Sequence, residues 1–241
     1  GIPFIQVPGS LLAQVDSSVG GKVAVNHPLG KNLIGAFYQP KTVIADLKVL
    51  NTLPDRELSA GLAEVIKYGI IADKSLFEYL AINYGKILQR DSEALEFIIA
   101  RSCRIKAQVV GQDEREAGLR MILNYGHTIG HAVEAVTNFS RYNHGEAVAI
   151  GMCGAARLSY YRGLCKEDSW LAVRSLVKKF RLPTEATGCK ASELLEFVKR
   201  DKKILNGKIN WILLREIGKV EINNTIDWVA VQRVLQEITA D

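Results

Sequence analysis

The segment Asn124-Tyr125-Gly126-His127-Thr128-Ile129-Gly130-His131, followed by His144-Gly145-Glu146, holds three of the four histidines in this 241-residue chain. Imidazole is the usual nitrogen ligand of divalent metals, and it also titrates nearest to neutral pH. The cluster therefore predicts metal binding, proton transfer or both. Buried, hydrogen-bonded core histidines are the alternative, and the histidines alone favour neither interpretation.

The polar residues around these histidines have the spacing of one helix face. Arg120, Asn124 and His127 lie 11, 7 and 4 positions before His131, and a helix running through Gly126 would place all of them on that face. Their flanking residues are apolar, and burying an unpaired polar stripe is costly, so we expect a polar cleft rather than a solvated face. A helix break at Gly126 is the alternative, and Asn124 would then be an N-cap.

Composition places the chain among soluble globular proteins, with 48% hydrophobic and 24% charged residues. The net charge of +5 would suit a nucleic-acid binder, but the basic residues form no long run. Anionic small substrates explain the charge equally well, so we expect no nucleic-acid partner. The most apolar run, residues 147–156, is too short to span a bilayer, and we expect no membrane role.

The cysteines bear on the cellular compartment, and the first residues bear on whether the chain is part of a longer protein. Four cysteines without a C-x-x-C pair favour reduced thiols and a cytoplasmic location. The chain opens with Gly1-Ile2-Pro3-Phe4 and has neither an initiator Met nor a signal-peptide core, which predicts a piece of a longer protein.

Hydrophobic periodicity divides the chain into a short β region and a long helical region. Up to about residue 50, short β-type runs at 4–7, 22–25 and 42–45 alternate with Gly and Pro turns. Helical periodicity then predicts helices over residues 56–68, 74–84, 92–110, 128–136, 146–161, 168–180 and 191–199. A hairpin is predicted from strands at 208–214 and 219–222, with a closing helix after Asp227. We therefore expect a β and hairpin junction followed by a mostly α-helical domain with a small C-terminal β-hairpin.

An acidic residue inside an apolar helix is a candidate third metal ligand. Glu64 and Lys67 are spaced i, i+3 within the apolar run of residues 61–67. A helix-surface ion pair worth under about 1 kcal/mol is the ordinary interpretation. A Glu-His-His set with an open fourth position would instead be a catalytic zinc arrangement.

Glycine and lysine near the start of the chain form a weaker signal for anion binding. Gly20-Gly21-Lys22 follows Asp16, and Gly30-Lys31-Asn32 comes soon after. Glycine lets backbone amides approach an anion, and a nearby lysine neutralises it, although this is not a Walker A motif and a hairpin turn is more common. Asp201-Lys202-Lys203 is a weaker signal still.

Taken together, these motifs resemble the 3-dehydroquinate synthase family. The runs that carry the resemblance, in the family's order, are LAQVDSSVGGK (12–22), NHPLGKN (26–32), GLAEVIKYG (61–69), DEREAGLR (113–120), NYGHTIGH (124–131) and HGEAV (144–148). The resemblance implies an α/β multidomain family, with an N-terminal dinucleotide-binding domain, a C-terminal helical domain and an active site between them. Residues 1–52 would be the remainder of the NAD-binding domain with the junction, and residues 53–241 the helical metal- and substrate-binding domain.

The resemblance also implies a role for each matching residue. Glu64, His127 and His144 would bind zinc, which cobalt could replace, and His131 would relay a proton. The implied substrate contacts are Lys106 and Arg120 for the carboxylate, Asp16 and Lys67 near the hydroxyls, and Lys22, Asn32, Asn124 and either Lys202 or Lys203 for the phosphate. The implied NAD contacts are Gly9, Ser10, Lys22, Lys31, Val49, Leu50, Asn51 and Thr52.

Three departures from the family pattern bear on NAD. The family usually has Thr-Thr where Gly9-Ser10 stands, and Thr where Val23 follows Lys22. The glycine-rich dinucleotide fingerprint is missing, so the isolated chain is expected to bind NAD weakly and to be inactive by itself.

The implied reaction is the conversion of DAHP, a phosphorylated sugar acid, to 3-dehydroquinate and phosphate in the shikimate pathway, by a homodimer. Three alternatives remain. The chain could belong to another sugar-phosphate cyclase, to a metal-dependent polyol dehydrogenase, or to a non-catalytic remnant that binds a metal or an anion. Nucleic-acid binding would rest only on the basic charge.

Overall fold

A computed structural model describes residues 2–27, 30–116, 118–204, 209–225 and 227–239, without the side chains of 26–33 and 201–204. The strands are β1 (Ile5–Gln6), β2 (Lys22–His27), β3 (Gly30–Phe37), β4 (Thr42–Val43), β5 (Trp211–Glu216) and β6 (Lys219–Asn223). The α-helices are α1 (Asp55–Ala72), α2 (Lys74–Leu88), α3 (Ser92–Gln112), α4 (His127–Val136), α5 (His144–Tyr161), α6 (Glu167–Lys179), α7 (Ala191–Ile204) and α8 (Trp228–Thr239). Shorter helical segments are the π-helix η1 (Ala13–Ser17) and the 3-10 helices η2 (Leu47–Thr52) and η3 (Leu119–Asn124).

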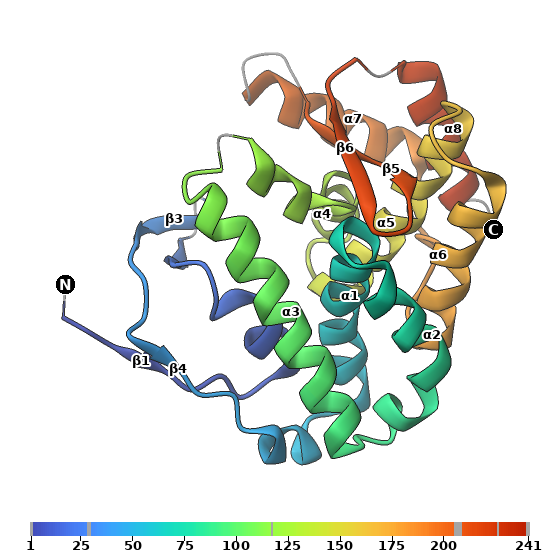
Figure 1. Cartoon of the computed structure of the whole chain (residues 1–241). Coiled ribbons are helices and arrows are strands. Elements are labelled where there is room, and N and C mark those ends of the chain that lie inside the picture. The colour runs from blue at the N-terminus through green and yellow to red at the C-terminus, as the bar shows by residue number, and fades with distance from the viewer. Residues whose placement is uncertain (1, 28–29, 117, 205–208, 226, 240–241) are drawn as a thin grey trace.

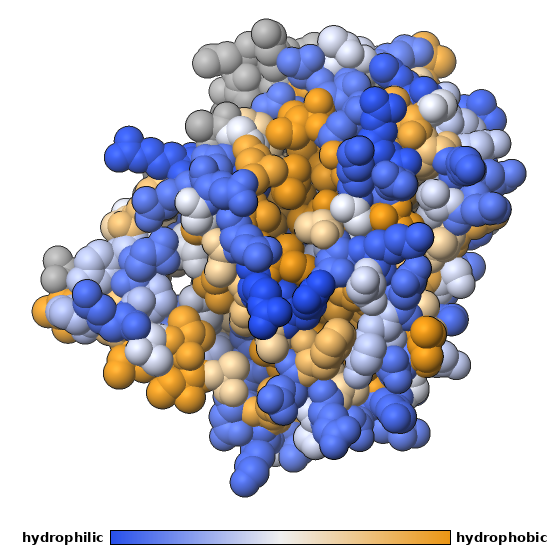
Figure 2. Space-filling view, viewed as in Figure 1, coloured by the Kyte–Doolittle hydropathy of each residue, from blue (hydrophilic) through white to orange (hydrophobic). Residues whose placement is uncertain are grey.

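The described strands form three separate two-stranded sheets. β1 pairs with β4 in parallel, β2 and β3 form an antiparallel hairpin, and β5 and β6 form a second hairpin. The first two sheets lie at one end of the molecule, and η1 connects them to the helices by packing against α1 and α3 (Figure 1). Hydrophobic side chains gather on the surface of this end (Figure 2); the exposed ones on β1, β4 and their flanks are Ile2, Ile5, Val7 and Ile44.

Helix α1 is the central helix of the fold and packs against α2, α3 and α5 (Figure 1). Every residue from Leu58 to Ile71 is buried, as expected for a helix that is apolar on all faces. Helix α5 is similarly buried from Ala147 to Ser159, apart from Arg157. Glycine makes the contact between these two helices close, because a Cβ on Gly145 would lie 2.1 Å from the carbonyl oxygen of Ala60.

The mostly helical architecture and both predicted hairpin regions are confirmed, but a continuous helix through Gly126 is wrong. Gly126 adopts a left-handed conformation (φ +81°), so η3 ends before it and α4 begins at His127. Gly126, rather than Asn124, is the N-cap of α4. A side chain at Gly126 would also collide with Met152 on α5, which explains why only glycine is suitable there. Among the helices that the structure describes, none has the length and apolar composition needed to cross a bilayer.

Candidate active site

Three predicted metal ligands from three different helices converge in the interior. Glu64 of α1, His127 at the start of α4 and His144 at the start of α5 each offer a ligand atom, and these atoms lie within 4.8 Å of one another. Both Nε2 atoms, of His127 and of His144, lie 3.7 Å from Oε1 of Glu64. We call these three residues the metal-ligand cluster.

Glu64 is an ionised carboxylate in the core. Its side chain is 0% exposed, and Lys67, which is also buried, forms an ion pair with Oε2. Burial raises the pKa of Glu64, but the Lys67 ammonium and the two histidines outweigh burial and hold that pKa well below its ordinary value. Neither carboxylate oxygen accepts a well-formed hydrogen bond from any described residue. A buried carboxylate with unused acceptor capacity, facing two imidazoles, fits a divalent cation such as Zn²⁺.

The two histidines of the metal-ligand cluster are oriented by hydrogen bonds on their other ring nitrogens. Nδ1 of His127 lies 3.2 Å from the carbonyl oxygen of Tyr125, and donation to that oxygen leaves Nε2 free to bind a metal. Burial, reinforced by Lys67, lowers the pKa of His127 to about 3, so this imidazole is neutral. Nδ1 of His144 lies 3.4 Å from the buried carboxylate of Glu134. Burial would lower the pKa of His144, but Glu134 and Glu64 raise it to about 9.

His131 lies beside the cluster and is more exposed. Its ring is 5.4 Å from that of His127, one turn earlier on α4, and 6.3 Å from that of His144. An exposed imidazole next to buried metal ligands can exchange protons with a bound substrate or solvent. A second group of side chains could also hold a metal ion, and it consists of His131, Glu134 and His144. Because His144 belongs to both groups, they are alternative metal sites and not two separate ones.

A polar chain connects η1 to the helical core near the metal ligands. Nζ of Lys106, on α3, donates to the carboxylate and to the carbonyl oxygen of Asp16 at 2.6 and 2.5 Å. The hydroxyl of Tyr68, the neighbour of Lys67 on α1, donates to the same carboxylate at 2.9 Å. Burial raises the pKa of Asp16, but Lys106 reverses the effect and the net shift is downward.

Arg120 and Lys106 both lie close to Gly20, near the start of the hairpin. The guanidinium of Arg120 is buried and donates to the carbonyl oxygens of Gly20 and Glu114 at 3.0 and 2.5 Å. A Cβ on Gly20 would lie 3.0 Å from Arg120 and 3.6 Å from Lys106. The positions of these two cationic side chains are therefore tied to the glycine turn before β2.

A third group joins two residues that were predicted to bind phosphate. Lys22 of β2 forms an ion pair with Glu116, and the side-chain amide of Asn124 donates to the other oxygen of that carboxylate at 2.6 Å. We call Lys22, Glu116 and Asn124 the anion cluster.

Most of the predicted metal and substrate residues therefore lie in neighbouring groups, which run from the metal-ligand cluster through Asp16 and Lys106 to the anion cluster. The side chains of Lys31, Asn32, Lys202 and Lys203 lie outside the described part of the chain. Of the predicted NAD contacts, Gly9 and Ser10 lie just before η1, whereas residues 49–52 belong to η2. The side chain of Leu50 is fully buried, so only its backbone could face a ligand.

Sequence reasoning missed three residues that contact the predicted ones. Glu134 follows His127 and His131 on the same face of α4 at i+7 and i+3, and that spacing could have identified it. Glu116 lies in one of the motifs that carry the family resemblance. Its left-handed backbone (φ +61°) could not be predicted, because glutamate has no preference for that conformation. The role of Tyr68 depends on the position of η1, which local sequence does not determine.

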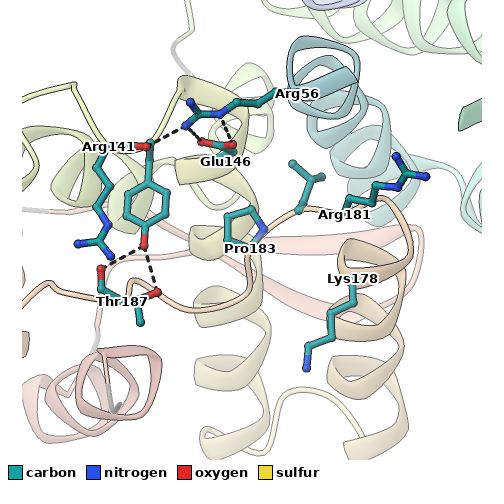
Figure 3. Close-up of a pocket in the computed structure, with 9 residues that line it drawn as sticks. Arg56, Arg141, Glu146, Lys178, Arg181, Pro183 and Thr187 are labelled. Atoms are coloured by element: carbon teal, nitrogen blue, oxygen red, sulfur yellow. Dashed lines mark hydrogen bonds and ion pairs between the residues drawn. The ribbon is translucent and has the colours of Figure 1, made fainter. Parts of the chain in front are cut away.

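A pocket of about 590 Å³ elsewhere on the surface contains none of the predicted site residues (Figure 3). It forms around Arg56, whose guanidinium makes two 2.7 Å hydrogen bonds to Glu146 and one of 2.8 Å to the carbonyl oxygen of Arg141. Glu146 also completes a capping box with Asn143. These contacts join the first turn of α1 to the first turn of α5, two residues after His144.

Comparison with known proteins agrees with this geometry. The family models described as 3-dehydroquinate synthase N-terminal and C-terminal match residues 1–60 and 61–204. Curated 3-dehydroquinate synthases from Thermodesulfovibrio yellowstonii and Nitrosospira multiformis are 52% and 49% identical over 98% and 100% of this chain. The chain spans about two thirds (66%) of the length of each of these relatives.

Solved structures of two other synthases share this fold. The 2-epi-5-epi-valiolone synthase from Streptomyces hygroscopicus subsp. jinggangensis 5008, with NAD⁺ and Zn²⁺ bound, has a TM-score of 0.89 at 25% identity and covers 98% of this chain and 66% of its own. A 2-deoxy-scyllo-inosose synthase with NAD⁺ and Co²⁺ has a TM-score of 0.86 at 28% identity, over 98% and 67%. The chain belongs to the 3-dehydroquinate synthase family, because two family models match residues 1–204 and curated relatives are about 50% identical over nearly the whole chain.

Proposed function

We propose that this chain carries the metal- and substrate-binding part of a 3-dehydroquinate synthase, which converts DAHP to 3-dehydroquinate and phosphate in the biosynthesis of chorismate and aromatic amino acids. The observation that carries the proposal is the convergence of Glu64, His127 and His144. In this proposal residues 1–52 complete an NAD-binding domain, and residues 53–241 form the helical domain.

Each part of the site has a distinct task in the proposed reaction. The metal-ligand cluster would hold Zn²⁺, or Co²⁺ in its place. When bound, the metal would supply Lewis-acid activation of a substrate hydroxyl, and NAD would supply reversible hydride transfer. His131 would move protons beside the buried ligands, and Lys67 keeps Glu64 ionised.

The cationic residues would position a substrate that carries both a carboxylate and a phosphate. Lys106 and Arg120, which both lie close to Gly20, would hold the carboxylate. Asp16, which pairs with Lys106, would lie near the substrate hydroxyls. Lys22 and Asn124 would hold the phosphate, assisted by Asn32 and by either Lys202 or Lys203. Charge-assisted hydrogen bonds of this kind supply orientation as well as affinity.

The NAD contacts proposed are Gly9, Ser10, Lys22, Lys31 and residues 49–52. A Cβ on Gly9 would meet no atom within 4 Å, so the backbone there is open to a ligand. The NAD⁺-bound structure of the valiolone synthase supports a shared cofactor.

The proposal is tested by incubating the purified protein with DAHP, Zn²⁺ and NAD. Phosphate release and 3-dehydroquinate formation are then measured. Turnover of sedoheptulose 7-phosphate instead would reject the choice of substrate in favour of a related cyclase. One further candidate is a metal-binding remnant without activity, because the metal-ligand cluster alone would suffice to bind a metal. Calorimetry that detects Zn²⁺ binding but no NAD binding would support that remnant.

Oligomeric state and location complete the proposal. We propose a cytoplasmic homodimer, and light scattering on the purified chain with and without NAD would measure its mass.

A further inference from the structure

An acidic side chain already occupies the donors proposed to hold phosphate. The carboxylate of Glu116 bridges the anion cluster, since one oxygen pairs with Nζ of Lys22 and the other accepts from the side-chain amide of Asn124 at 2.6 Å. An ammonium and an amide directed at two oxygens of one anion are the contacts that a phosphate group would make. Glu116 therefore presents two oxygens where two phosphate oxygens are proposed to bind.

The backbone around Glu116 is held in place by several hydrogen bonds. Asp113 accepts hydrogen bonds from the backbone N–H groups of Gly118 and Arg120 at 2.8 and 2.9 Å. The buried guanidinium of Arg120 in turn binds the carbonyl oxygen of Glu114. These bonds fix both ends of the turn that carries Glu116, so its carboxylate is directed to the anion cluster by the fold.

Glu116 itself is in an unfavourable backbone conformation. Its φ of +61° lies in the left-handed region, which costs free energy in a residue other than glycine. Its side chain is only 24% exposed, whereas that of Lys22 is 49% exposed. Both side chains are partly exposed, so the carboxylate can leave Lys22 by side-chain rotation while the turn keeps its conformation.

We propose that Glu116 is an internal competitor that must leave Lys22 and Asn124 before the phosphate of a ligand can bind there. Two anions cannot share the same donors without strong repulsion. The competitor would weaken the binding of every anion by a similar factor, and it would help inorganic phosphate to leave after elimination, because the carboxylate returns to the donors. This inference rests on the proposed function, which assigns phosphate to Lys22 and Asn124.

The alternative role for Glu116 is to position Lys22 and Asn124 for the ligand. The two roles predict opposite results when its charge is removed. A competitor that is removed leaves phosphate bound more tightly, whereas a positioning residue that is removed leaves phosphate bound more weakly.

Calorimetric titration of the chain with inorganic phosphate separates these roles. Glu116→Gln keeps the shape of the side chain and an acceptor for Asn124, but it removes the charge paired with Lys22. We expect phosphate to bind roughly fivefold tighter, which is the factor that corresponds to an exposed ion pair of about 1 kcal/mol. Glu114→Gln is the matched control, because this carboxylate lies in the same turn and pairs with Gln39 instead. The control should leave phosphate affinity within about twofold.

A Lys22→Met background shows where the effect arises. The gain from Glu116→Gln should be smaller in the double variant, because the ion pair with Lys22 is already absent and only the hydrogen bond from Asn124 still holds residue 116 at the anion cluster. Unchanged or weaker phosphate binding by Glu116→Gln, or a gain of the same size with and without Lys22, would overturn the internal competitor. If Lys22→Met alone leaves phosphate affinity unchanged, the anion site is elsewhere, which contradicts the proposed phosphate pocket as well. A weaker affinity in Lys22→Met with no effect of Glu116→Gln overturns only the competitor.

Discussion

The metal-ligand cluster and the anion cluster each place one carboxylate between two nitrogen groups, but the protein supports them differently. Glu64 is completely buried, and its partners come from the first turns of two packed helices. Glu116 lies in a turn and contacts a half-exposed lysine on a hairpin. In the interior the geometry is set by helix packing, and a lost charge cannot be replaced by water. At the surface, water or a ligand can replace the carboxylate, so that cluster can exchange its partner.

Glu64→Gln should have the largest effect and tests whether the buried cluster depends on its charge. Zn²⁺ affinity should fall by more than the roughly 10- to 100-fold that loss of an outer-shell partner causes, as measured by calorimetry. The free energy of unfolding in urea should fall by about 3–5 kcal/mol, because Lys67 is left as a buried, unpaired charge.

Glu78→Gln is the control for this substitution. Glu78 pairs with Lys74 at 3.7 Å on the surface of α2, and both side chains are well exposed. It should change stability by less than about 1 kcal/mol and leave Zn²⁺ affinity unchanged. Equal losses of stability in the two variants would remove the distinction between buried and exposed carboxylates.

Glu134→Gln examines whether support beyond the ligands matters in the buried cluster. The carboxylate of Glu134 faces Nδ1 of His144, and its loss weakens the orientation of that ring and the basicity of Nε2. Zn²⁺ affinity should fall roughly 10- to 100-fold. The same substitution in a His144→Ala background should have no further effect, and a fall that persists there would show that Glu134 acts by another route.

The contrast between the clusters also explains what the sequence could predict. Long runs with helical period identify α1 and α5, and residue type alone proposes Glu64, His127 and His144 as ligands. The break at Gly126 was one of two interpretations, because the left-handed turn is selected by the close approach of Met152 on α5. Contacts such as Glu116 with Lys22 join residues 94 positions apart through a turn and a hairpin, and local propensity contains no information about them.

Gly145→Ala tests whether helix packing sets the geometry of the metal ligands. The added Cβ would lie 2.1 Å from the carbonyl oxygen of Ala60, so α1 and α5 must separate and His144 must move from Glu64. We expect a loss of about 1–3 kcal/mol in the free energy of unfolding, together with weaker Zn²⁺ binding. Gly85→Ala on α2 is the matched control, since nothing lies within 4 Å of its Cβ, and it should stabilise the fold by about 0.5–1 kcal/mol.

Lys22→Met should have the smallest effect on the fold, and it examines the exposed side of the comparison. It removes an ion pair, as Glu64→Gln does, but the pair is partly solvated and Glu116 keeps its hydrogen bond from Asn124. Unfolding in urea should therefore show a change of less than about 1 kcal/mol, because water replaces the lost ammonium. A loss near that of Glu64→Gln would mean that the anion cluster is part of the folded core, and a carboxylate needed by the core could not be exchanged for phosphate.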